Sequence, residues 1–188
     1  MARLKLPEVL TQDECRALAA ATNPRYLTGL RDRCIIRLML NTGLRSAECL
    51  DLKLTDIDWN SGQMMVREGK GQKDRALWIN PDVLELLQKW RARRPDGSDY
   101  LFITGKGGPV SGRALKAMVE RRGKKAGLTK HVHPHTLRHS FATEMYRQTK
   151  DIRRVQKMLG HADLSTTMIY THIVDEDVET AMKDFNLG

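Results

Sequence analysis

The sequence predicts an α+β domain that is mainly α-helical and carries one small antiparallel β-sheet. Apolar residues recur at helical spacing between recognisable helix caps along most of the chain, and the pattern changes to alternation only around residues 63–79. A length of 188 residues with 40% hydrophobic content is enough for one domain with its own core. Because no stretch is apolar enough or long enough to cross a membrane, no membrane partner is expected.

Helix signals open the chain. Thr11 and Glu14 have the spacing of a capping box, which predicts a helix over residues 12–21. The string LRDRCIIRLMLNTG predicts a buried helix that ends at Gly43, since glycine readily adopts the left-handed conformation that closes a helix. A second, shorter helix is expected directly afterwards, through LRSAECLDL.

The sheet is expected where the period changes. Met64 and Val66 alternate with their neighbours, and a Gly-Lys-Gly turn leads from them to a second apolar run over residues 76–79. The two runs predict an antiparallel hairpin whose projecting loop carries Lys70.

Helix signals return after the sheet. Asn80 as N-cap and Pro81 at the first helical position predict a helix in NPDVLELLQKWRARR. Ser111 can cap a basic helix, a further helix should begin after Pro134, and an amphipathic one in DIRRVQKMLG should end at Gly160. The string LSTTMIYTHI is expected to form one or two helical turns.

Charge and cysteine content narrow the class of protein. A net charge of +9 and a pI near 9.7 favour a polyanionic partner, most often nucleic acid, although a basic protein without such a partner remains the alternative. Cys15, Cys34 and Cys49 all fall in apolar helical patterns and are interpreted as reduced core residues. The first residues lack the apolar core of a signal peptide, so a cytoplasmic location is expected.

The last segment reverses the sign of the charge. DEDVETAMKDFNLG holds five acidic residues against one lysine, and it predicts an amphipathic helix over residues 175–185. Such a helix is unsuited to a phosphate backbone and suits a protein surface instead.

Several polar residues have chemical potential that depends on their combination. His135 and Arg138 stand three positions apart in a predicted helix, so their side chains can reach a common target. An arginine matches the oxygens of a phosphate, and a histidine can donate or accept a proton near neutral pH. Alone, each would be an ordinary surface charge or a satisfied polar group. The full candidate set is Arg45, Lys70, His135, Arg138, His161 and Tyr170.

This set, in this order, resembles the catalytic constellation of the tyrosine recombinase (phage integrase) family, and most of all its Xer-like bacterial and phage members. The strings TGLRSAECLDL, GKGQKDR, HPHTLRHSFAT and LGHADLSTTMIYTH resemble family motifs. The resemblance runs from about Leu6 to Phe185 and implies the catalytic-domain fold of that family. It also implies a site-specific recombinase or integrase that cuts and rejoins DNA strands through a 3′-phosphotyrosyl intermediate, without ATP, metal or another cofactor.

The resemblance implies that Tyr170 is the nucleophile. A phenol has a pKa of about 10, so at neutral pH it needs a group that accepts its proton, and His135 is the candidate. Lys70, on its loop, is expected to protonate the leaving 5′-oxygen. Two neighbouring guanidiniums should lower its pKa and make it a better acid.

The remaining members are expected to bind the attacked phosphate. Arg45 and Arg138 would hold its two non-bridging oxygens, and His161 would add a hydrogen bond. Glu48 lies one turn after Arg45 and has two interpretations: it orients Arg45 by a salt bridge, or it forms an ordinary surface ion pair.

Other basic residues are expected to contact the DNA backbone. Lys73 and Arg75 follow the Lys70 loop, and a basic helix follows later in the chain. The helix residues in question are Arg113, Lys116, Arg121 and Lys124. His135 and His139 have the i, i+4 spacing of zinc ligands, but no cysteine or carboxylate stands near them, so no metal site is expected.

The chain also departs from the family. Members usually carry an N-terminal helical domain that clamps the duplex, whereas here the family pattern begins near residue 6. The expectation is therefore a single catalytic domain over residues 1–188, without the core-binding domain. It is either a fragment that represents the catalytic domain or a short family member that works without the clamp. In both cases we expect weak DNA binding with strong salt dependence.

The expected partners are double-stranded DNA and further copies of the chain. A dimer or tetramer is expected on DNA, and a monomer or weak oligomer in its absence. Residues 175–188 either fold back on their own domain or, as is the family habit, dock on a neighbouring protomer, which is the placement we expect.

Two rival functions use the same residues. A type IB topoisomerase would nick and reseal DNA without exchanging strands, but the integrase-like strings argue against it. A non-catalytic DNA-binding regulator would keep the fold and lose part of the constellation, whereas all six positions are filled here.

Overall fold

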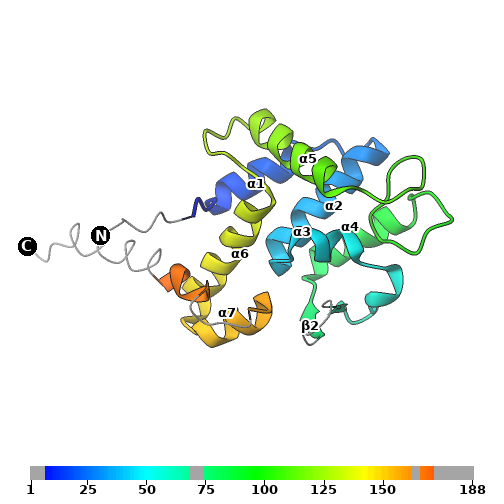
Figure 1. The fold of residues 1–188 in the computed structure, drawn as a ribbon. Coiled ribbons are helices and arrows are strands. Elements are labelled where there is room, and N and C mark those ends of the chain that lie inside the picture. The colour runs from blue at the N-terminus through cyan, green and yellow to red at the C-terminus, as the bar shows by residue number, and fades with distance from the viewer. Residues whose placement is uncertain (1–6, 68–73, 162–165, 172–188) are drawn as a thin grey trace, which may run out of the picture.

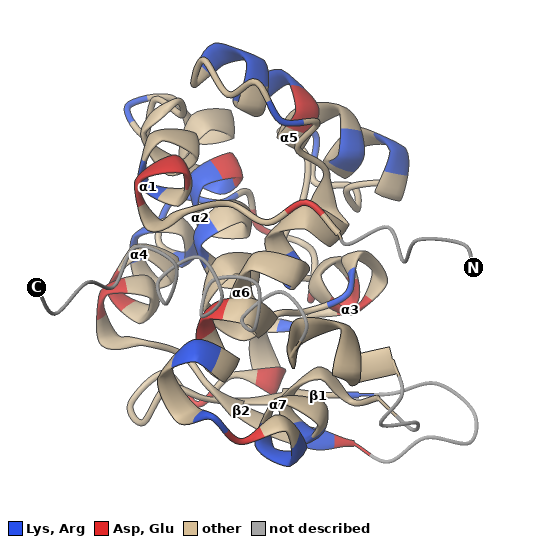
Figure 2. Ribbon diagram, turned by 90° about the vertical axis from the view of Figure 1, so that its left-hand side faces the viewer, with Lys and Arg blue, Asp and Glu red and all other residues tan. Residues whose placement is uncertain are grey.

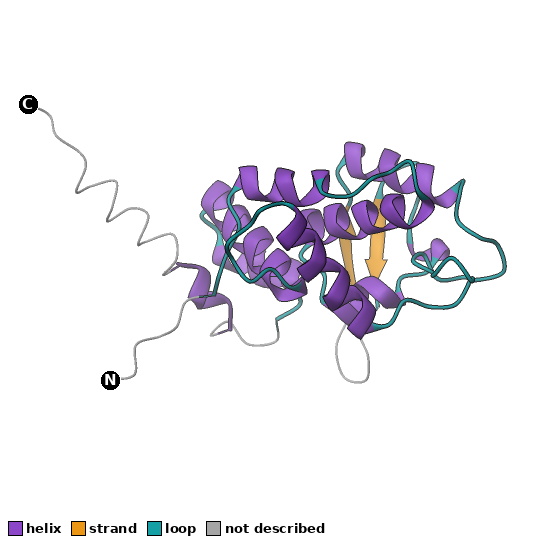
Figure 3. Ribbon diagram, turned by 90° about the horizontal axis from the view of Figure 1, so that it is seen from above, coloured by secondary structure: helices purple, strands orange, loops and turns teal. Residues whose placement is uncertain are grey.

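A computed structural model describes residues 7–67, 74–161 and 166–171 and confirms the predicted mainly helical α+β architecture (Figure 1). The helices are α1 (Gln12–Ala20), α2 (Leu27–Thr42), α3 (Ser46–Asp51), α4 (Pro81–Arg91), α5 (Gly112–Lys125), α6 (Pro134–Thr149) and α7 (Ile152–Leu159), with a 3-10 turn η1 at Leu54–Asp56. The strands are β1 (Gln63–Val66) and β2 (Arg75–Trp78). Figure 3 shows how small a part of the fold the two strands make up.

The predicted helix caps are present. Thr11 and Glu14 form the capping box, with the Thr11 amide donating to the Glu14 carboxylate at 2.7 Å and the Glu14 amide donating to the Thr11 hydroxyl at 3.2 Å. Asn80 accepts from the amide of Asp82, and Ser111 accepts from that of Ala114. These side chains satisfy amides that have no partner inside the helix, which fixes where each helix begins.

The hairpin forms as the alternation predicts. β1 and β2 pair antiparallel, with Gln63 opposite Trp78 and Val66 opposite Arg75. Met64 and Val66 are fully buried, so one face of β1 belongs to the core. β2 begins at Arg75, one residue before the predicted run. Residues 68–73, which include Lys70 and Lys73, lie outside the described residues.

The main core surrounds α2, which packs against α1, α4 and α6. Cys34 and Cys49 are buried in it, as predicted for core residues, whereas Cys15 is half-buried and packs against its edge. Within the described ranges, no helix is both long enough and apolar enough to cross a membrane.

A second apolar cluster lies between α6 and α7. Phe141 and Ala142 from α6 pack there against Val155 and Leu159 from α7. Tyr170 completes the cluster from residues 166–171, which are helical as expected. The predicted helix over residues 175–185 lies outside the described part of the chain.

Gly43 ends α2 at a point where α6 and α7 approach its backbone closely. It closes α2 in the left-handed conformation, with φ of 65°, as predicted. A Cβ at this position would lie 2.3 Å from Phe141 Cδ1 on α6 and 3.0 Å from Leu159 Cδ2 on α7. Both the backbone conformation and the close approach therefore require glycine.

Gly43→Ala should lower the free energy of unfolding by about 3 kcal/mol, because left-handed strain adds to overpacking. Gly127→Ala is the matched control: its φ is 73°, but a Cβ there meets nothing within 4 Å. It should cost only the strain, about 1 kcal/mol. Urea unfolding measures both, and equal effects would show that Gly43 does not depend on the packing of α6 and α7.

Candidate active site

Helix α6 presents three of the site's polar residues on neighbouring turns. Pro134 occupies its first position, so His135 lies in the first turn, and Arg138 and His139 follow three and four residues later. His135 is exposed, His139 is half-buried, and the Arg138 side chain keeps only 5% of its surface. The helix thus carries its arginine inward and leaves the first histidine open to a ligand.

Arg138 ties together the ends of two helices. Its Nη1 donates to the carbonyl of Gly43 at 2.6 Å, and its Nη2 donates to the carbonyl of Leu159 at 2.8 Å. These carbonyls lie at the C-termini of α2 and α7, where they have no intrahelical donor. Burial, and then the neighbouring charge of Arg45, lowers the pKa of Arg138 to about 10, so it is still charged at neutral pH.

His161 is held between Arg138 and Thr167. Its Nε2 lies 2.9 Å from Arg138 Nη2, and its Nδ1 lies 2.9 Å from Thr167 Oγ1. Since a guanidinium can only donate, Nε2 accepts and Nδ1 carries the hydrogen. Burial, followed by the charges of Arg138 and Arg45, lowers the pKa of His161 to about 4. The ring is therefore neutral, with its Nε2 lone pair turned to Arg138.

Glu48 receives two arginines on one buried carboxylate. Its Oε1 accepts from Arg45 Nη1 at 2.6 Å and from Arg75 Nη1 at 3.1 Å, and its Oε2 accepts from Arg75 Nη2 at 2.9 Å. The Glu48 side chain is 8% exposed. Burial acts to raise the pKa of Glu48, but the hydrogen bonds from Arg75 and Arg45 outweigh it and hold the pKa below the usual value. Of its two interpretations, the ion pair with Arg45 is present and is not a surface one.

Arg75 lies in a different place from the one expected of a DNA-backbone contact. It is 9% exposed, its Nε donates to the carbonyl of Met158 at 2.9 Å, and its other nitrogens face Glu48. The sequence held a signal for this. Arg75 is two residues before the buried Leu77, and alternation along β2 puts both on the inward face.

Three arginines converge on the C-terminus of α7. The carbonyls of Met158, Leu159 and Gly160 accept, in order, from Arg75, Arg138 and Arg45, the last at 2.9 Å. Cations are favoured here because unpaired carbonyls give the end of a helix partial negative charge. Arg45 remains the most open of the three, with 35% of its side chain exposed.

Tyr170 lies beside these groups but is enclosed. It is 1% exposed, and its hydroxyl lies 3.0 Å from Nδ1 of His139. Burial raises the pKa of Tyr170, while the positive charge of Arg138 acts in the opposite direction. Sequence reasoning did not assign His139 a role at the tyrosine. The signal was its position, one turn after His135 on the same face of α6.

The other expected residues divide into two groups. Lys70 and Lys73 lie outside the described residues. The α5 residues expected to contact DNA are exposed, and Figure 2 shows Lys and Arg along this helix. These residues are Arg113, Lys116, Arg121 and Lys124.

Comparison with known proteins identifies the family. The model of the phage integrase family matches residues 8–177. The chain belongs to the phage integrase family. Tyrosine recombinase XerC of Xylella fastidiosa is 38% identical over 170 residues, which cover 90% of this chain and 57% of the relative. Tyrosine recombinase XerA of Pyrococcus horikoshii is 37% identical over 185 residues, which cover 97% of this chain and 62% of the relative.

Solved structures confirm the expected tyrosine recombinase catalytic-domain fold. The crystal structure of XerA recombinase matches with a TM-score of 0.85 at 33% identity, over 98% of this chain and 65% of that one. XerH recombinase bound to a palindromic difH substrate, in a post-cleavage complex, matches with a TM-score of 0.82 at 35% identity, over 95% of this chain and 53% of that one. This phage integrase chain therefore spans less than two thirds of the length of these relatives.

Glu48→Gln should lower the free energy of unfolding by about 3 kcal/mol at neutral pH, because the buried guanidinium of Arg75 and the partly exposed one of Arg45 lose their counter-charge. Since folding depresses the pKa of Glu48, its contribution is fully present above the ordinary pKa of 4.5 and is lost as pH falls through the lower folded value. The difference between the two proteins should therefore shrink in acid. Urea unfolding at a series of pH values from about 3 to about 7 measures this difference in stability.

Glu85→Gln is the control for that comparison. Glu85 also pairs with a cation, Lys89, but both side chains are more than half exposed, at 65% and 62%. The variant should change stability little at any pH. A Glu48→Gln effect as small as this control would mean that the two arginines do not depend on the carboxylate.

Proposed function

We propose that this chain carries the catalytic site of a site-specific DNA recombinase that works through a phosphotyrosine intermediate. The observation that carries the proposal is the convergence of Arg45, Arg138 and His161 at the end of α7, with Tyr170 enclosed beside them. Such a group of fixed donors with excess positive charge is suited to a phosphate that gains negative charge during attack. The chain belongs to the phage integrase family and is similar to the tyrosine recombinases XerC and XerA. These relationships support the same reaction.

In the proposed reaction, Tyr170 Oη forms a bond to the phosphorus of a DNA strand as the bond to the 5′-oxygen breaks. The products are a 3′-phosphotyrosyl link and a free 5′-hydroxyl. The phenolic proton goes to His135, which is exposed on α6, and Lys70 gives a proton to the leaving oxygen. A second 5′-hydroxyl reverses the same steps, so the energy of the phosphodiester is kept and no ATP is needed.

The arginines and His161 bind the phosphate in this scheme. Arg45 is the natural first contact because a third of its side chain is exposed. Arg138 is charged, but its Nη2 already donates to the carbonyl of Leu159 and to His161 Nε2. A phosphate therefore competes with these two acceptors for Nη2. An anion at this point raises the pKa of His161 and allows its Nε2 to become a donor.

Contact with the DNA backbone is proposed for α5 and for Lys73. The α5 residues Arg113, Lys116, Arg121 and Lys124 are exposed, and α5 packs against α3 and α6, which carry the site. Phosphate contacts of this kind position a duplex without reading its sequence. Arg75 no longer belongs to the proposed set, because it is buried against Glu48.

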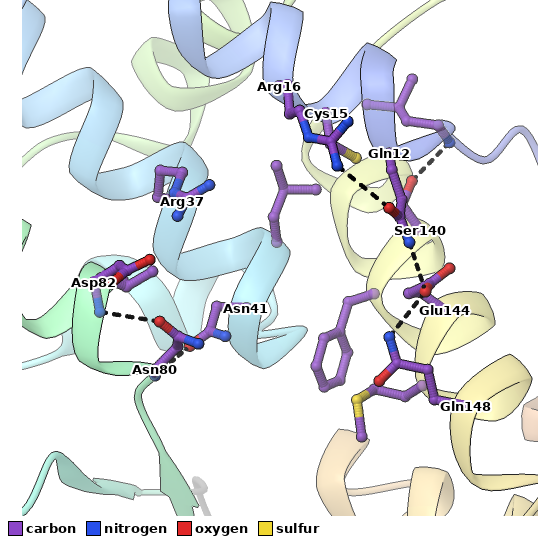
Figure 4. Close-up of a pocket in the computed structure, with 15 residues that line it drawn as sticks. Gln12, Cys15, Arg16, Arg37, Asn41, Asn80, Asp82, Ser140, Glu144 and Gln148 are labelled. Atoms are coloured by element: carbon purple, nitrogen blue, oxygen red, sulfur yellow. Dashed lines mark hydrogen bonds between the residues drawn. The ribbon is translucent and has the colours of Figure 1, made fainter.

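Self-association on DNA is proposed through residues 175–188. A pocket of about 440 Å³ opens between α1, α2, α4 and α6 (Figure 4), with Phe141 and Met145 among its apolar residues. Its charged lining residues are Arg16, Arg37, Asp82 and Glu144. The segment alternates acidic residues with apolar ones at helical spacing, so a neighbouring protomer's copy suits this lining. Dimers or tetramers on cytoplasmic DNA would then form by exchange of this segment.

Tyr170→Phe should abolish covalent attachment to DNA while leaving non-covalent binding within about twofold, because the hydroxyl alone supplies the nucleophile. The substrate is a library of nicked duplexes with randomised sequence around the nick, from which attached DNA is recovered after denaturation. Tyr146→Phe, a tyrosine on the same helix as His135, is the control and should retain attachment. Attachment that survives Tyr170→Phe would assign the nucleophile to another residue.

Arg121→Gln with Lys124→Gln should weaken duplex binding and reduce the slope of log K against log salt by about 1 for each lost phosphate contact. Fluorescence anisotropy with a duplex of arbitrary sequence measures this over a series of salt concentrations. Lys89→Gln is the control, since Lys89 is exposed on α4 and already pairs with Glu85. A control that loses as much affinity would show that overall charge, and not α5, determines binding.

A further inference from the structure

The hydroxyl of Tyr170 contacts His139 and not His135. The distance from Tyr170 Oη to His139 Nδ1 is 3.0 Å, and the two ring centres are 5.8 Å apart. His135 lies one turn earlier on α6, with its ring centre 6.4 Å from that of His139. The family resemblance assigns the role of proton acceptor to His135. The observed contact between Tyr170 and His139 therefore has no role in that scheme.

The direction of this hydrogen bond follows from the surroundings of His139. Burial, and then the charges of His135, Arg138 and His133, lowers the pKa of His139 to about 4. Its ring is therefore neutral near pH 7, and Nδ1 is free to accept when the hydrogen sits on Nε2. Burial raises the pKa of Tyr170, so the phenol keeps its proton and donates it into the bond.

We propose that His139 is a positioning residue that holds Tyr170 in an enclosed resting place as a neutral phenol, and that the tyrosine must leave this contact before it attacks. The proposal rests on the proposed function, because it concerns the nucleophile of that reaction. It assigns His139 to the state before cleavage and leaves proton acceptance to a group that meets Tyr170 after it has moved.

The acid–base properties of the two groups also make His139 a poor proton acceptor in this arrangement. Burial raises the pKa of the Tyr170 phenol, whereas burial and then neighbouring positive charge lower the pKa of the His139 imidazole to about 4. Both shifts oppose transfer of the proton along the hydrogen bond. The contact therefore serves to hold the hydroxyl in place.

A second hydrogen bond ties the same helical turn to the phosphate-binding residues. Thr167 lies three residues before Tyr170, and its Oγ1 accepts a hydrogen bond from His161 Nδ1. The contact with Arg138 fixes His161 in the tautomer that makes this bond. A phosphate that accepts the hydrogen bond from Arg138 Nη2 leaves His161 Nε2 without the donor that fixes this tautomer. Residues 166–171 are thus attached at His139 and at His161, and substrate binding acts directly on the second attachment.

The test measures how often Tyr170 becomes accessible, without DNA. Tetranitromethane nitrates exposed tyrosines, and peptide mass spectrometry gives the rate at each one. Tyr26, which is 68% exposed, is the internal standard, whereas Tyr170 should react slowly in the wild type. His139→Leu should raise the relative rate at Tyr170 about tenfold, because the buried hydroxyl loses its acceptor. His139→Asn, which keeps an acceptor oxygen near the Nδ1 position, should stay close to the wild type.

His131→Leu is the matched control, since His131 is 69% exposed and pairs with Glu120 away from Tyr170. It should leave the rate at Tyr170 unchanged. An unchanged rate in His139→Leu, with Tyr26 reacting normally, would overturn the proposal. So would a rate in His139→Asn as high as in His139→Leu.

A measurement on the native side chain covers the case in which His139→Leu fails to fold. Nitrogen-15 NMR of labelled histidines should show Nδ1 of His139 as an unprotonated acceptor, and Tyr170→Phe should shift that signal while the His131 signals stay in place. A protonated Nδ1, or no shift, would overturn the proposal.

Covalent attachment to nicked DNA then separates this proposal from the proposed function. His139→Leu should form the adduct at least as fast as the wild type. Loss of the adduct in His139→Leu and its recovery in His139→Asn would make His139 part of the chemistry and overturn the holding role. Absence of any adduct in the wild type would refute the recombinase function, while the nitration and NMR results would stand.

Discussion

The end of α7 is the point on which the site depends. Three consecutive carbonyls, of residues 158–160, each accept from a different arginine, and His161 follows directly. Two of these arginines, Arg45 and Arg75, also share the buried carboxylate of Glu48. A helix end therefore orients the cations, and the carboxylate fixes α3 and β2 against it. In the proposed function, this geometry is in place before any phosphate arrives, which is the condition for electrostatic catalysis.

The same arrangement leaves an excess of positive charge. The three arginines Arg45, Arg75 and Arg138 share the carboxylate of Glu48, which lies within 4 Å of each. Burial first, and then this excess charge, lowers the pKa of His161 to about 4 and that of Arg138 to about 10. An anion would relieve this repulsion. A site under such strain is poorly suited to stabilise a fold and well suited to bind phosphate.

Local rules predicted much of this, and long-range contacts set the limit. The caps at Thr11 and Asn80 and the closing turn at Gly43 follow from neighbours in sequence, so they could be predicted. The pairing of Arg75 with Glu48 joins residues 27 positions apart, and that of His139 with Tyr170 spans 31. No periodicity encodes such pairs. The family motifs indicated the candidate residues of the site, but motifs carry no geometry, so the enclosed position of Tyr170 could be found only in the fold.

The contrast between the prepared cations and the enclosed tyrosine has a physical rationale. A reaction that conserves the phosphodiester's energy runs equally well in both directions, so no energy input prevents cleavage at the wrong time. Control must then act on the encounter between nucleophile and phosphate. The donors at the end of α7 stay in place whether or not Tyr170 moves. Tyr170 is held by its packing in the α6–α7 cluster and by hydrogen bonds at His139 and Thr167, each of which contributes about 1 kcal/mol. Release of the tyrosine, and not reorganisation of the cations, is therefore the step on which control of the proposed reaction can act.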